Sequence, residues 1–174
     1  EAKSAARDSN NNLYIIEGDE DVWKSTNSGV NWTKINGSDF NGGNGNIFGF
    51  AINRSNHFFS VDAQADVWKS TDSGVSWTLI KDDYNAAAGN NADGMAIDND
   101  NSIFILDVQD VWKSTNSGVN WTKINDDFNG VDDSNAGRAI WTSSNNTIFI
   151  TDGSEDLFAS SDGGVTFAKQ SSDF

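Results

Sequence analysis

Short apolar segments alternate with clusters of Asn, Asp, Gly and Ser along the whole chain, and this pattern returns roughly every 45 residues. Short segments rich in β-branched and aromatic residues and bounded by turn formers are typical of β-strands. No segment has the length and period of a helix. The second repeat predicts strands at Phe48–Asn53, His57–Asp62, Asp66–Ser70 and Ser76–Ile80, and the third at Gly94–Asp98, Ser102–Asp107, Asp110–Ser114 and Asn120–Asn125. We name the four strands of each repeat A to D.

The repeats are close copies of one another. Asp21–Asn36 and Asp110–Asn125 share the sixteen letters DVWKSTNSGVNWTKIN, Asp66–Lys81 differs at a few positions, and Asp156–Gln170 is a divergent copy. One repeat of about 45 residues with four strands matches a blade of a β-propeller. We therefore expect an all-β fold, a single β-propeller domain over residues 1–174 with four four-stranded antiparallel blades at about 1–40, 41–84, 85–128 and 129–174.

The A strands share a motif of small residues, which reads Gly49-Phe50-Ala51, Gly94-Met95-Ala96, Gly137-Arg138-Ala139 and, less closely, Ser4-Ala5-Ala6. Small residues let backbones approach closely where inner strands crowd together. The motif favours a closed ring of four blades. Trp141 has no counterpart in this alignment.

An eight-residue segment joins strands C and D in every repeat: Ser25–Trp32, Ser70–Trp77, Ser114–Trp121 and Ser160–Phe167. It resembles the Asp box, or BNR repeat, of sialidase-like propellers, whose pattern is Ser-x-Asp-x-Gly-x-Thr-Trp. The resemblance implies a propeller with the motif on the face opposite the usual ligand site. It assigns a structural role to Ser25, Asn27, Gly29, Trp32, Ser70, Asp72, Gly74, Trp77, Ser114, Asn116, Gly118, Trp121, Ser160, Asp162, Gly164 and Phe167.

The residue types of this segment suit a tight turn. Asp or Asn at the third position can accept hydrogen bonds from backbone N–H groups, and Gly adopts a positive φ at little cost. We expect the final aromatic residue to pack beneath the turn. The other repeated indoles, Trp23, Trp68 and Trp112 of strand C, are expected in the core rather than on an open sugar-binding surface.

The formal net charge is −15, from 26 acidic and 11 basic residues. Such a charge disfavours nucleic acid and anionic membranes, and no apolar run is long enough to cross a bilayer. Cysteine and proline are absent. Abundant Asn, Asp, Gly and Ser fit a secreted or cell-surface protein.

Most of the acidic residues fall in the B–C and D–A connections, which emerge on the same face of a propeller. The favoured interpretation is a solvated acidic surface, and the alternative is a cation site, because calcium prefers several oxygen ligands on polar loops. The best candidate ligands are Asp126, Asp127, Asn129, Asp132 and Asp133. No cofactor other than calcium is indicated.

A sialidase would need three arginines around a carboxylate and a tyrosine nucleophile. The three arginines, Arg7, Arg54 and Arg138, occupy unequal strand positions, and the family's Arg-Ile-Pro signature is impossible without proline. Only Tyr14 and Tyr84 are available as nucleophiles. We expect a protein without catalytic residues.

The sequence favours a non-catalytic extracellular propeller that binds a glycan or a protein, or that assembles with copies of itself into an oligomer or filament. The alternative is a fragment of a larger Asp-box glycoside hydrolase of the sialidase-like type.

Overall fold

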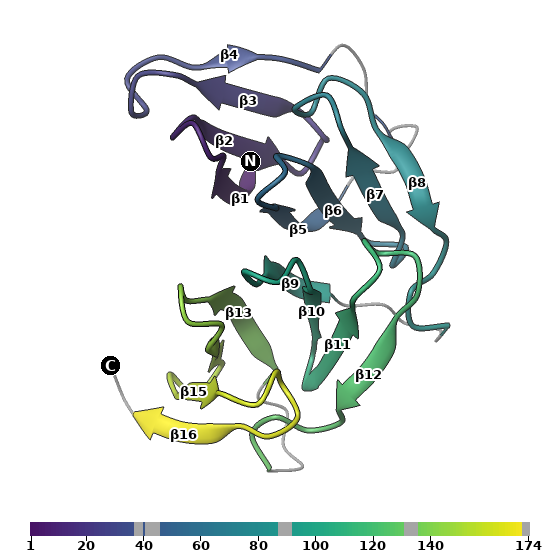
Figure 1. Ribbon diagram of the computed structural model, residues 1–174, viewed down its shortest axis with the longest axis vertical. Coiled ribbons are helices and arrows are strands. Elements are labelled where there is room, and N and C mark those ends of the chain that lie inside the picture. Colours follow the sequence, from purple (N-terminus) through teal and green to yellow (C-terminus); the bar gives the residue numbers. More distant parts are fainter. Residues whose placement is uncertain (37–39, 41–45, 87–91, 131–135, 172–174) are drawn as a thin grey trace. The chain divides into compact units, whose positions relative to one another are not determined.

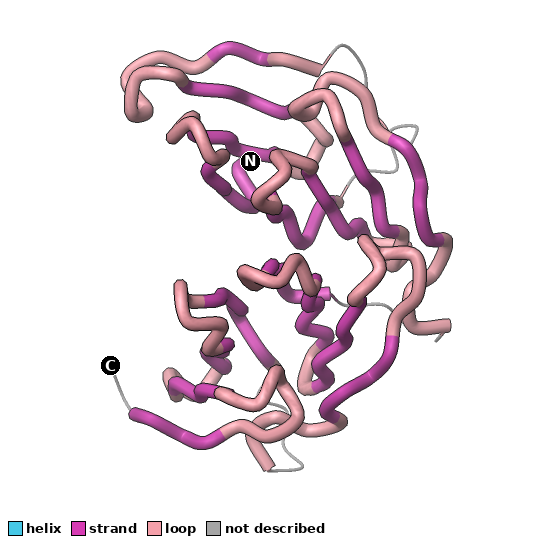
Figure 2. Tube along the Cα trace, viewed as in Figure 1, coloured by secondary structure: helices cyan, strands magenta, loops and turns pink. Residues whose placement is uncertain are grey.

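The computed structural model describes residues 1–36, 40, 46–86, 92–130 and 136–171, which form strands and turns (Figures 1 and 2). No helix of these residues has the length and apolarity needed to cross a membrane. The described strands are β1 (Ala2–Arg7), β2 (Leu13–Glu17), β3 (Val22–Ser25), β4 (Thr33–Lys34), β5 (Ile47–Ile52), β6 (Phe58–Asp62), β7 (Val67–Ser70), β8 (Thr78–Lys81), β9 (Ala92–Ile97), β10 (Ile103–Asp107), β11 (Asp110–Ser114), β12 (Thr122–Asn125), β13 (Gly137–Thr142), β14 (Ile148–Asp152), β15 (Leu157–Ser160) and β16 (Ala168–Ser171).

These strands form four antiparallel sheets, in the orders β1-β2-β3-β4, β5-β6-β7-β8, β9-β10-β11-β12 and β13-β14-β15-β16, which we call blades 1 to 4. The chain divides into two compact units, Glu1–Tyr84 with blades 1 and 2 and Asn85–Phe174 with blades 3 and 4. The predicted fold class, an all-β propeller of four four-stranded antiparallel blades, is confirmed. The strands predicted for the second and third repeats lie within about two residues of the observed ones.

Burial decreases from the middle of each blade to its outer strand. Strands β6 and β10 are buried at every residue, as their sequences FFSVD and IFILD lead one to expect of strands covered on both faces. The D strands β4 and β16 are exposed at every residue. Short, polar outer strands leave little edge for pairing with another sheet.

In each unit the connection between its two blades places an aromatic ring on the following blade. In the first unit Phe40 stacks on Trp77, with ring centroids 4.6 Å apart, and lies 5.4 Å from Trp68. In the second unit Phe128 takes the equivalent place, 5.3 Å from Phe158 and 6.1 Å from Phe167. These rings join the apolar core of each unit to the turns at the edge of its second blade.

The A–B turns also connect the two blades of each unit. The Asn56 side chain accepts the N–H of Ser9 at 3.0 Å and donates to the Ser9 hydroxyl at 2.9 Å. Asn146 likewise accepts the N–H of Asn99 at 2.9 Å and donates to Asp100 at 2.8 Å. Both asparagines have a positive φ, which Asn tolerates better than most residues.

Strand register corrects the alignment of the fourth A strand. Gly49 pairs with Val61, and the residue at the same place in blade 4 is Ala139, which pairs with Thr151. Gly137 therefore lies two positions earlier than expected, before a β-bulge. Trp141, which pairs with Phe149, is the counterpart of the small A-strand alanines.

Candidate functional site

The C–D segments, which we call the repeat turns, share their serine and third-position hydrogen bonds in every blade, and blades 1 to 3 add a bond from the indole. In blade 1 the Ser25 hydroxyl accepts the N–H of Gly29 at 2.9 Å, and Asn27 Oδ1 accepts the N–H of Asn31 at 2.8 Å. The indole of Trp32 donates to the carbonyl of Gly29 at 2.9 Å. Bonds of 2.9 Å also join the N–H groups of Gly74, Gly118 and Gly164 to the hydroxyls of Ser70, Ser114 and Ser160, and Trp77 and Trp121 donate to the carbonyls of Gly74 and Gly118.

Two successive residues of each repeat turn have a positive φ, for example Ser28 at 58° and Gly29 at 86°. The sequence indicated the glycine but not the residue before it. The aromatic residues Trp32, Trp77, Trp121 and Phe167 are half-buried. The third positions, Asn27, Asp72, Asn116 and Asp162, each accept bonds from their own turn.

The turn bonds also set the charge state of the Asp162 carboxylate. The hydroxyl and N–H of Thr166 and the hydroxyl of Ser160 donate to it, and these bonds hold the pKa of Asp162 far below its usual range. The serine hydroxyls, the third-position side chains and the glycine N–H groups of the repeat turns are thus bonded within the turns, at one end of the blades and opposite the other end, which the B–C turns form.

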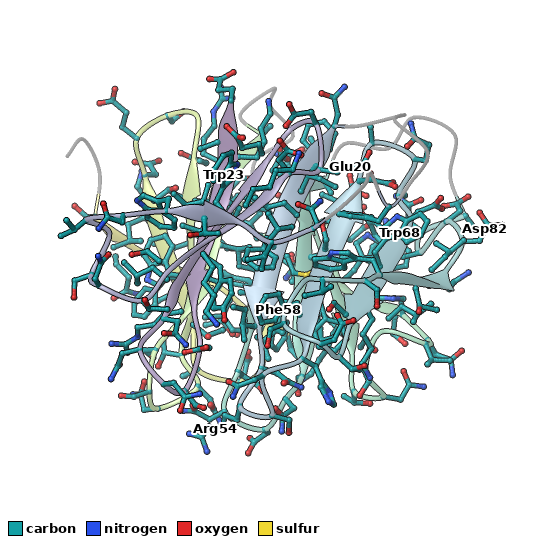
Figure 3. All side chains as sticks on the ribbon, turned by 90° about the horizontal axis from the view of Figure 1, so that it is seen from above. Glu20, Trp23, Arg54, Phe58, Trp68 and Asp82 are labelled. Atoms are coloured by element: carbon teal, nitrogen blue, oxygen red, sulfur yellow. The ribbon has the colours of Figure 1, made fainter. Side chains whose placement is uncertain are left out.

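The B–C turns lie at that other end and are built on their first acidic residue. In blade 2 Asp62 Oδ1 accepts the N–H groups of Gln64 at 2.9 Å and Asp66 at 3.0 Å. Asp62 Oδ2 accepts the indole N–H of Trp68 at 2.8 Å. In the first unit, Figure 3 shows Glu20 and Asp82 at one end of the blades and Arg54, from an A–B turn, at the opposite end.

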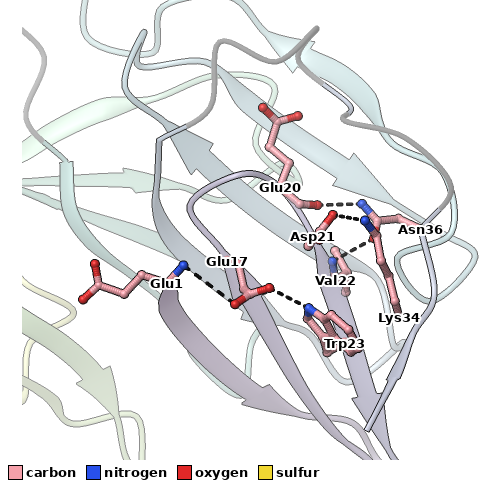
Figure 4. A network of polar contacts seen from close by, with 8 residues as sticks. All are labelled: Glu1, Glu17, Glu20, Asp21, Val22, Trp23, Lys34 and Asn36. Carbon is pink, nitrogen blue, oxygen red and sulfur yellow. Dashed lines mark hydrogen bonds and ion pairs between the residues drawn. The ribbon is translucent and has the colours of Figure 1, made fainter.

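Blade 1 has the same pairing of acid and indole. Glu17 Oε2 accepts the indole N–H of Trp23 at 2.7 Å (Figure 4). Trp23 and Trp68 are half-buried, so neither is an open aromatic surface. In both blades the strand-C indole satisfies the second oxygen of the B–C carboxylate.

Blade 4 keeps the carboxylate and lacks the indole. Asp152 Oδ1 accepts the N–H groups of Ser154 at 2.9 Å and Asp156 at 3.1 Å, as Asp62 does in blade 2. Phe158 stands where blades 1 and 2 have Trp, and a phenyl ring has no N–H to donate. Asp152 is only 5% exposed, and among the described residues none donates a hydrogen bond to its Oδ2.

A cleft of about 530 Å³ opens at this position, entirely within the second unit. Its lining includes Phe128, Phe158 and Phe167 together with the acids Asp127, Asp152 and Asp156 and with Lys169. Lys169 donates to Asp156 at 2.6 Å. An apolar floor with a few convergent polar groups is typical of ligand sites.

The sequence placed Asp152 and Asp156 only among the many acids of the B–C connections, and it assigned Asp127 and Asn129, which also line the cleft, to a calcium site. The available signal was the replacement of the strand-C tryptophan by Phe158 in one repeat of four. That change predicts a lost donor only once the partner of the indole is known.

The predicted calcium ligands are placed only in part. Asp126 forms an ion pair with Lys123 at 2.7 Å, Asp127 Oδ1 accepts the N–H of Gly130, and Asn129 Oδ1 accepts the side-chain N–H of Gln109. Asp132 and Asp133 lie outside the described residues. The three described candidates therefore each have a partner within the protein.

A different trio of acids comes together in blade 1: ligand atoms of Glu17, Asp19 and Asp21 lie within 4.8 Å of one another. Asp21 forms an ion pair with Lys34, and Glu17 contacts the N-terminal ammonium group at 3.7 Å (Figure 4). These contacts with positive groups compete with any cation for the same oxygens.

The arginines do not occupy equivalent places in their blades. Arg7 is the last residue of β1. Arg54 lies in the A–B turn of blade 2, at the end of the blades that carries few acids. Arg138 occupies the β-bulge of β13, at the B–C end, beside Gly153.

No protein-family model and no curated protein matches this chain. Solved structures do resemble it. YCF48 bound to a D1 peptide has a TM-score of 0.65 and 15% sequence identity, over 97% of this chain and 52% of YCF48. The extracellular domain of a putative one-component system from B. thetaiotaomicron has a TM-score of 0.68 and 9% identity, over 99% of this chain and 22% of that one.

A GH74 xyloglucanase from Xanthomonas campestris has a TM-score of 0.64 and 17% identity, over 92% of this chain and 28% of the enzyme. The chain thus spans about half, or less, of the length of each of these three proteins. At such low identities the similarity shows a common fold and no common activity.

Proposed function

We propose that this chain is an Asp-box propeller module without catalytic activity, and that it binds its ligand in the cleft of blade 4. The observation that carries the proposal is the cleft itself, where three phenyl rings lie beside a buried carboxylate whose second oxygen lacks a donor. The internal bonding of the four repeat turns supports the Asp-box assignment.

The structural neighbours are consistent with a binding role. YCF48 carries a bound peptide, and another neighbour is an extracellular domain. We extend both properties to this chain as proposals, namely that it binds a peptide or a glycan and that it works in a secreted or cell-surface setting.

The test is a binding screen on glycan arrays and a displayed peptide library. The affinity of each ligand found is then compared between the wild-type chain and the Phe158→Trp variant, which shows whether the ligand occupies the cleft. Restoring the indole of blades 1 and 2 fills the cleft and supplies a donor to Asp152. We expect at least one ligand class to bind the wild-type chain and to lose at least about tenfold in affinity in the variant. The matched control is Val75→Thr, at an exposed residue of a repeat turn in the first unit, which should bind normally.

Self-association is a second candidate, favoured by an exposed tryptophan that stacks on a half-buried phenylalanine. Trp141 is 41% exposed and stacks on Phe149 with ring centroids 5.5 Å apart. Such a pair on the surface suits contact with another copy of the chain. Light scattering behind a sizing column measures the mass, and Trp141→Ala should convert any oligomer to monomer if the pair forms the contact.

The hydrolase alternative has only the similarity to the xyloglucanase in its favour. It requires two carboxylates that act on a glycosidic bond, and Asp152 and Asp156 are the acids of the cleft that such an enzyme would use. Release of reducing sugar from xyloglucan by the wild-type chain, abolished in Asp152→Asn, would replace the binding proposal with this one.

A further inference from the structure

We propose that the cleft of blade 4 binds the side chain of an arginine in a partner peptide, with the guanidinium donating to Asp152 and lying against the phenyl rings. The inference rests on the proposed binding function and names the ligand group that this site takes.

The other blades show which kind of group fits this position. In blades 1 and 2 a planar side chain of strand C donates one N–H to the second oxygen of the B–C carboxylate, at 2.7 and 2.8 Å. The indole of Trp68 also packs beside the ring of Phe40. A group that replaces it in blade 4 must therefore be flat, must donate an N–H, and must tolerate aromatic neighbours on its faces.

Blade 3 shows that the second oxygen is also satisfied from outside strand C. There Asn85 donates its side-chain N–H to Asp107 Oδ2 at 2.7 Å. Blades 1, 2 and 3 thus each supply a donor from an amide or an indole. Asp152 of blade 4 is the exception within the described residues, although it is buried to a similar degree as Asp107.

The charge of the cleft selects a cation among the flat donors. Asp127, Asp152 and Asp156 line it, and the single ammonium group, that of Lys169, is already bonded to Asp156. The chain as a whole carries a net charge of −15, which attracts cationic peptides at long range. A neutral indole or sugar would gain nothing from this field.

Guanidinium meets these requirements better than ammonium does. It is planar, it presents several N–H groups in a fixed geometry, and it stacks on aromatic faces. All three phenylalanines of the cleft are aromatic neighbours for such a group, and Phe167, which is half-buried where Phe128 and Phe158 are buried, is the most accessible of them. A lysine side chain would bring the charge but has no planar group to lie against an aromatic ring.

The experiment measures the affinity of a fluorescent hexapeptide, Gly-Gly-Arg-Gly-Gly-Gly, and of versions with lysine, citrulline or tryptophan in place of arginine. Citrulline has nearly the shape of arginine without its charge. We expect the arginine peptide to bind at least about tenfold more tightly than each of the others, and its affinity to fall as salt is added.

Two variants assign the contact. Asp152→Asn keeps an oxygen for the turn, a role that Asn53 fills in an A–B turn, but places an N–H₂ where the second oxygen accepts. Phe158→Trp fills the cleft with the group found in blades 1 and 2. Each should lower the affinity for the arginine peptide by at least about tenfold, and Asp62→Asn, the matched change in blade 2, should leave it unchanged.

Equal binding of the citrulline and arginine peptides, or full affinity in Asp152→Asn, would overturn the inference. If no arginine peptide binds while a glycan or another peptide still binds in a way that Phe158→Trp abolishes, the arginine assignment is wrong and the proposed function stands. If no ligand shows such sensitivity, both are wrong. Circular dichroism of each variant shows whether it is folded. Asp152→Asn replaces the acceptor oxygen and Phe158→Trp fills the space beside it, so if one variant fails to fold the other still tests the contact.

Discussion

At the scale of single residues, the side chain at the β-bulge of an A strand lies beside the B–C turn of the same blade. The bulge residue of blade 3 is Asp93, whose carboxylate accepts the N–H of Val108 at 2.9 Å. Burial, together with the nearby charge of Asp107, raises the pKa of Asp93 to about 6, although the bond from Val108 and the charge of Arg138 act in the opposite direction.

This raised pKa predicts a pH-dependent gain in stability for Asp93→Asn. The folded chain holds a proton on Asp93 up to a higher pH than the unfolded chain does, so the wild type loses stability as pH rises from about 4 through about 6. The variant keeps an oxygen for Val108 and has no such loss. Because Asp93 is only partly buried, solvent screens part of this effect, and at pH 7 the free energy of unfolding of the variant should exceed that of the wild type by about 1–2 kcal/mol.

Urea unfolding of both proteins at several pH values measures this difference. It should vanish near pH 4 and reach its plateau above pH 6. A difference that stays constant with pH would show that Asp93 titrates normally.

Residue identity alone predicted the repeat-turn bonds better than it predicted the cleft. Ser25, Asn27 and Gly29 satisfy one another within a few residues, and such local bonding follows directly from the chemistry of the side chains. The cleft depends on Asp152, Phe158 and Phe128, which come from the end of β14, from β15 and from the connection between blades 3 and 4. Which of these meet is set by blade packing, and single-sequence patterns do not contain that information.

At the scale of the structural element, the repeat turns of blades 1 and 2 offer a matched comparison. Gly29 and Gly74 have nearly the same φ, 86° and 90°, so an alanine is strained equally at both. A Cβ on Gly74 would lie 3.2 Å from the Phe58 ring and from Val22, whereas a Cβ on Gly29 would make only ordinary contacts at 3.7 and 3.8 Å.

We therefore expect Gly29→Ala to lower the free energy of unfolding by about 1 kcal/mol, from backbone strain alone. Gly74→Ala should lower it by an additional 1–3 kcal/mol, roughly the cost of overpacking a rigid contact. Thermal unfolding of the two variants beside the wild type measures both values. Equal effects would mean that the turn of blade 2 shifts away from blade 1 without cost.

Strand positions were predicted well because every blade repeats the same alternation of apolar residues and turn formers. The fourth A strand was misaligned by two residues because its bulge moves Gly137 away from the place that Gly49 holds in blade 2. A bulge leaves no mark in the hydrophobic pattern, and the register of β13 became clear only from its pairing with β14.

At the scale of the whole molecule, the charge of −15 predicts a dependence of stability on salt. Repulsion among acids of the B–C turns and D–A connections opposes the compact state, and counterions screen it. We expect the Tm to rise by roughly 5 °C between about 10 mM and 0.3 M NaCl. A Tm that falls with salt would indicate that attractive ion pairs outweigh the repulsion.

Calcium provides the control for specific cation binding. At equal ionic strength, millimolar calcium should raise the Tm no more than magnesium does if the acidic turns form only a solvated surface. A larger rise with calcium would support the predicted site around Asp126, Asp127 and Asn129, and the variant Asp127→Asn should then remove it.

The division of the chain into two compact units has a consequence for its ancestry. Asp21–Asn36 and Asp110–Asn125, which share all sixteen letters, belong to the first blade of each unit, and the third turn position is Asn in both of those blades but Asp in the second blade of each. This alternation is the pattern that duplication of a pair of blades would leave in the sequence. On such a lineage blade 2 and blade 4 would be sister copies, and the change from tryptophan to phenylalanine at Phe158 would date from after the duplication.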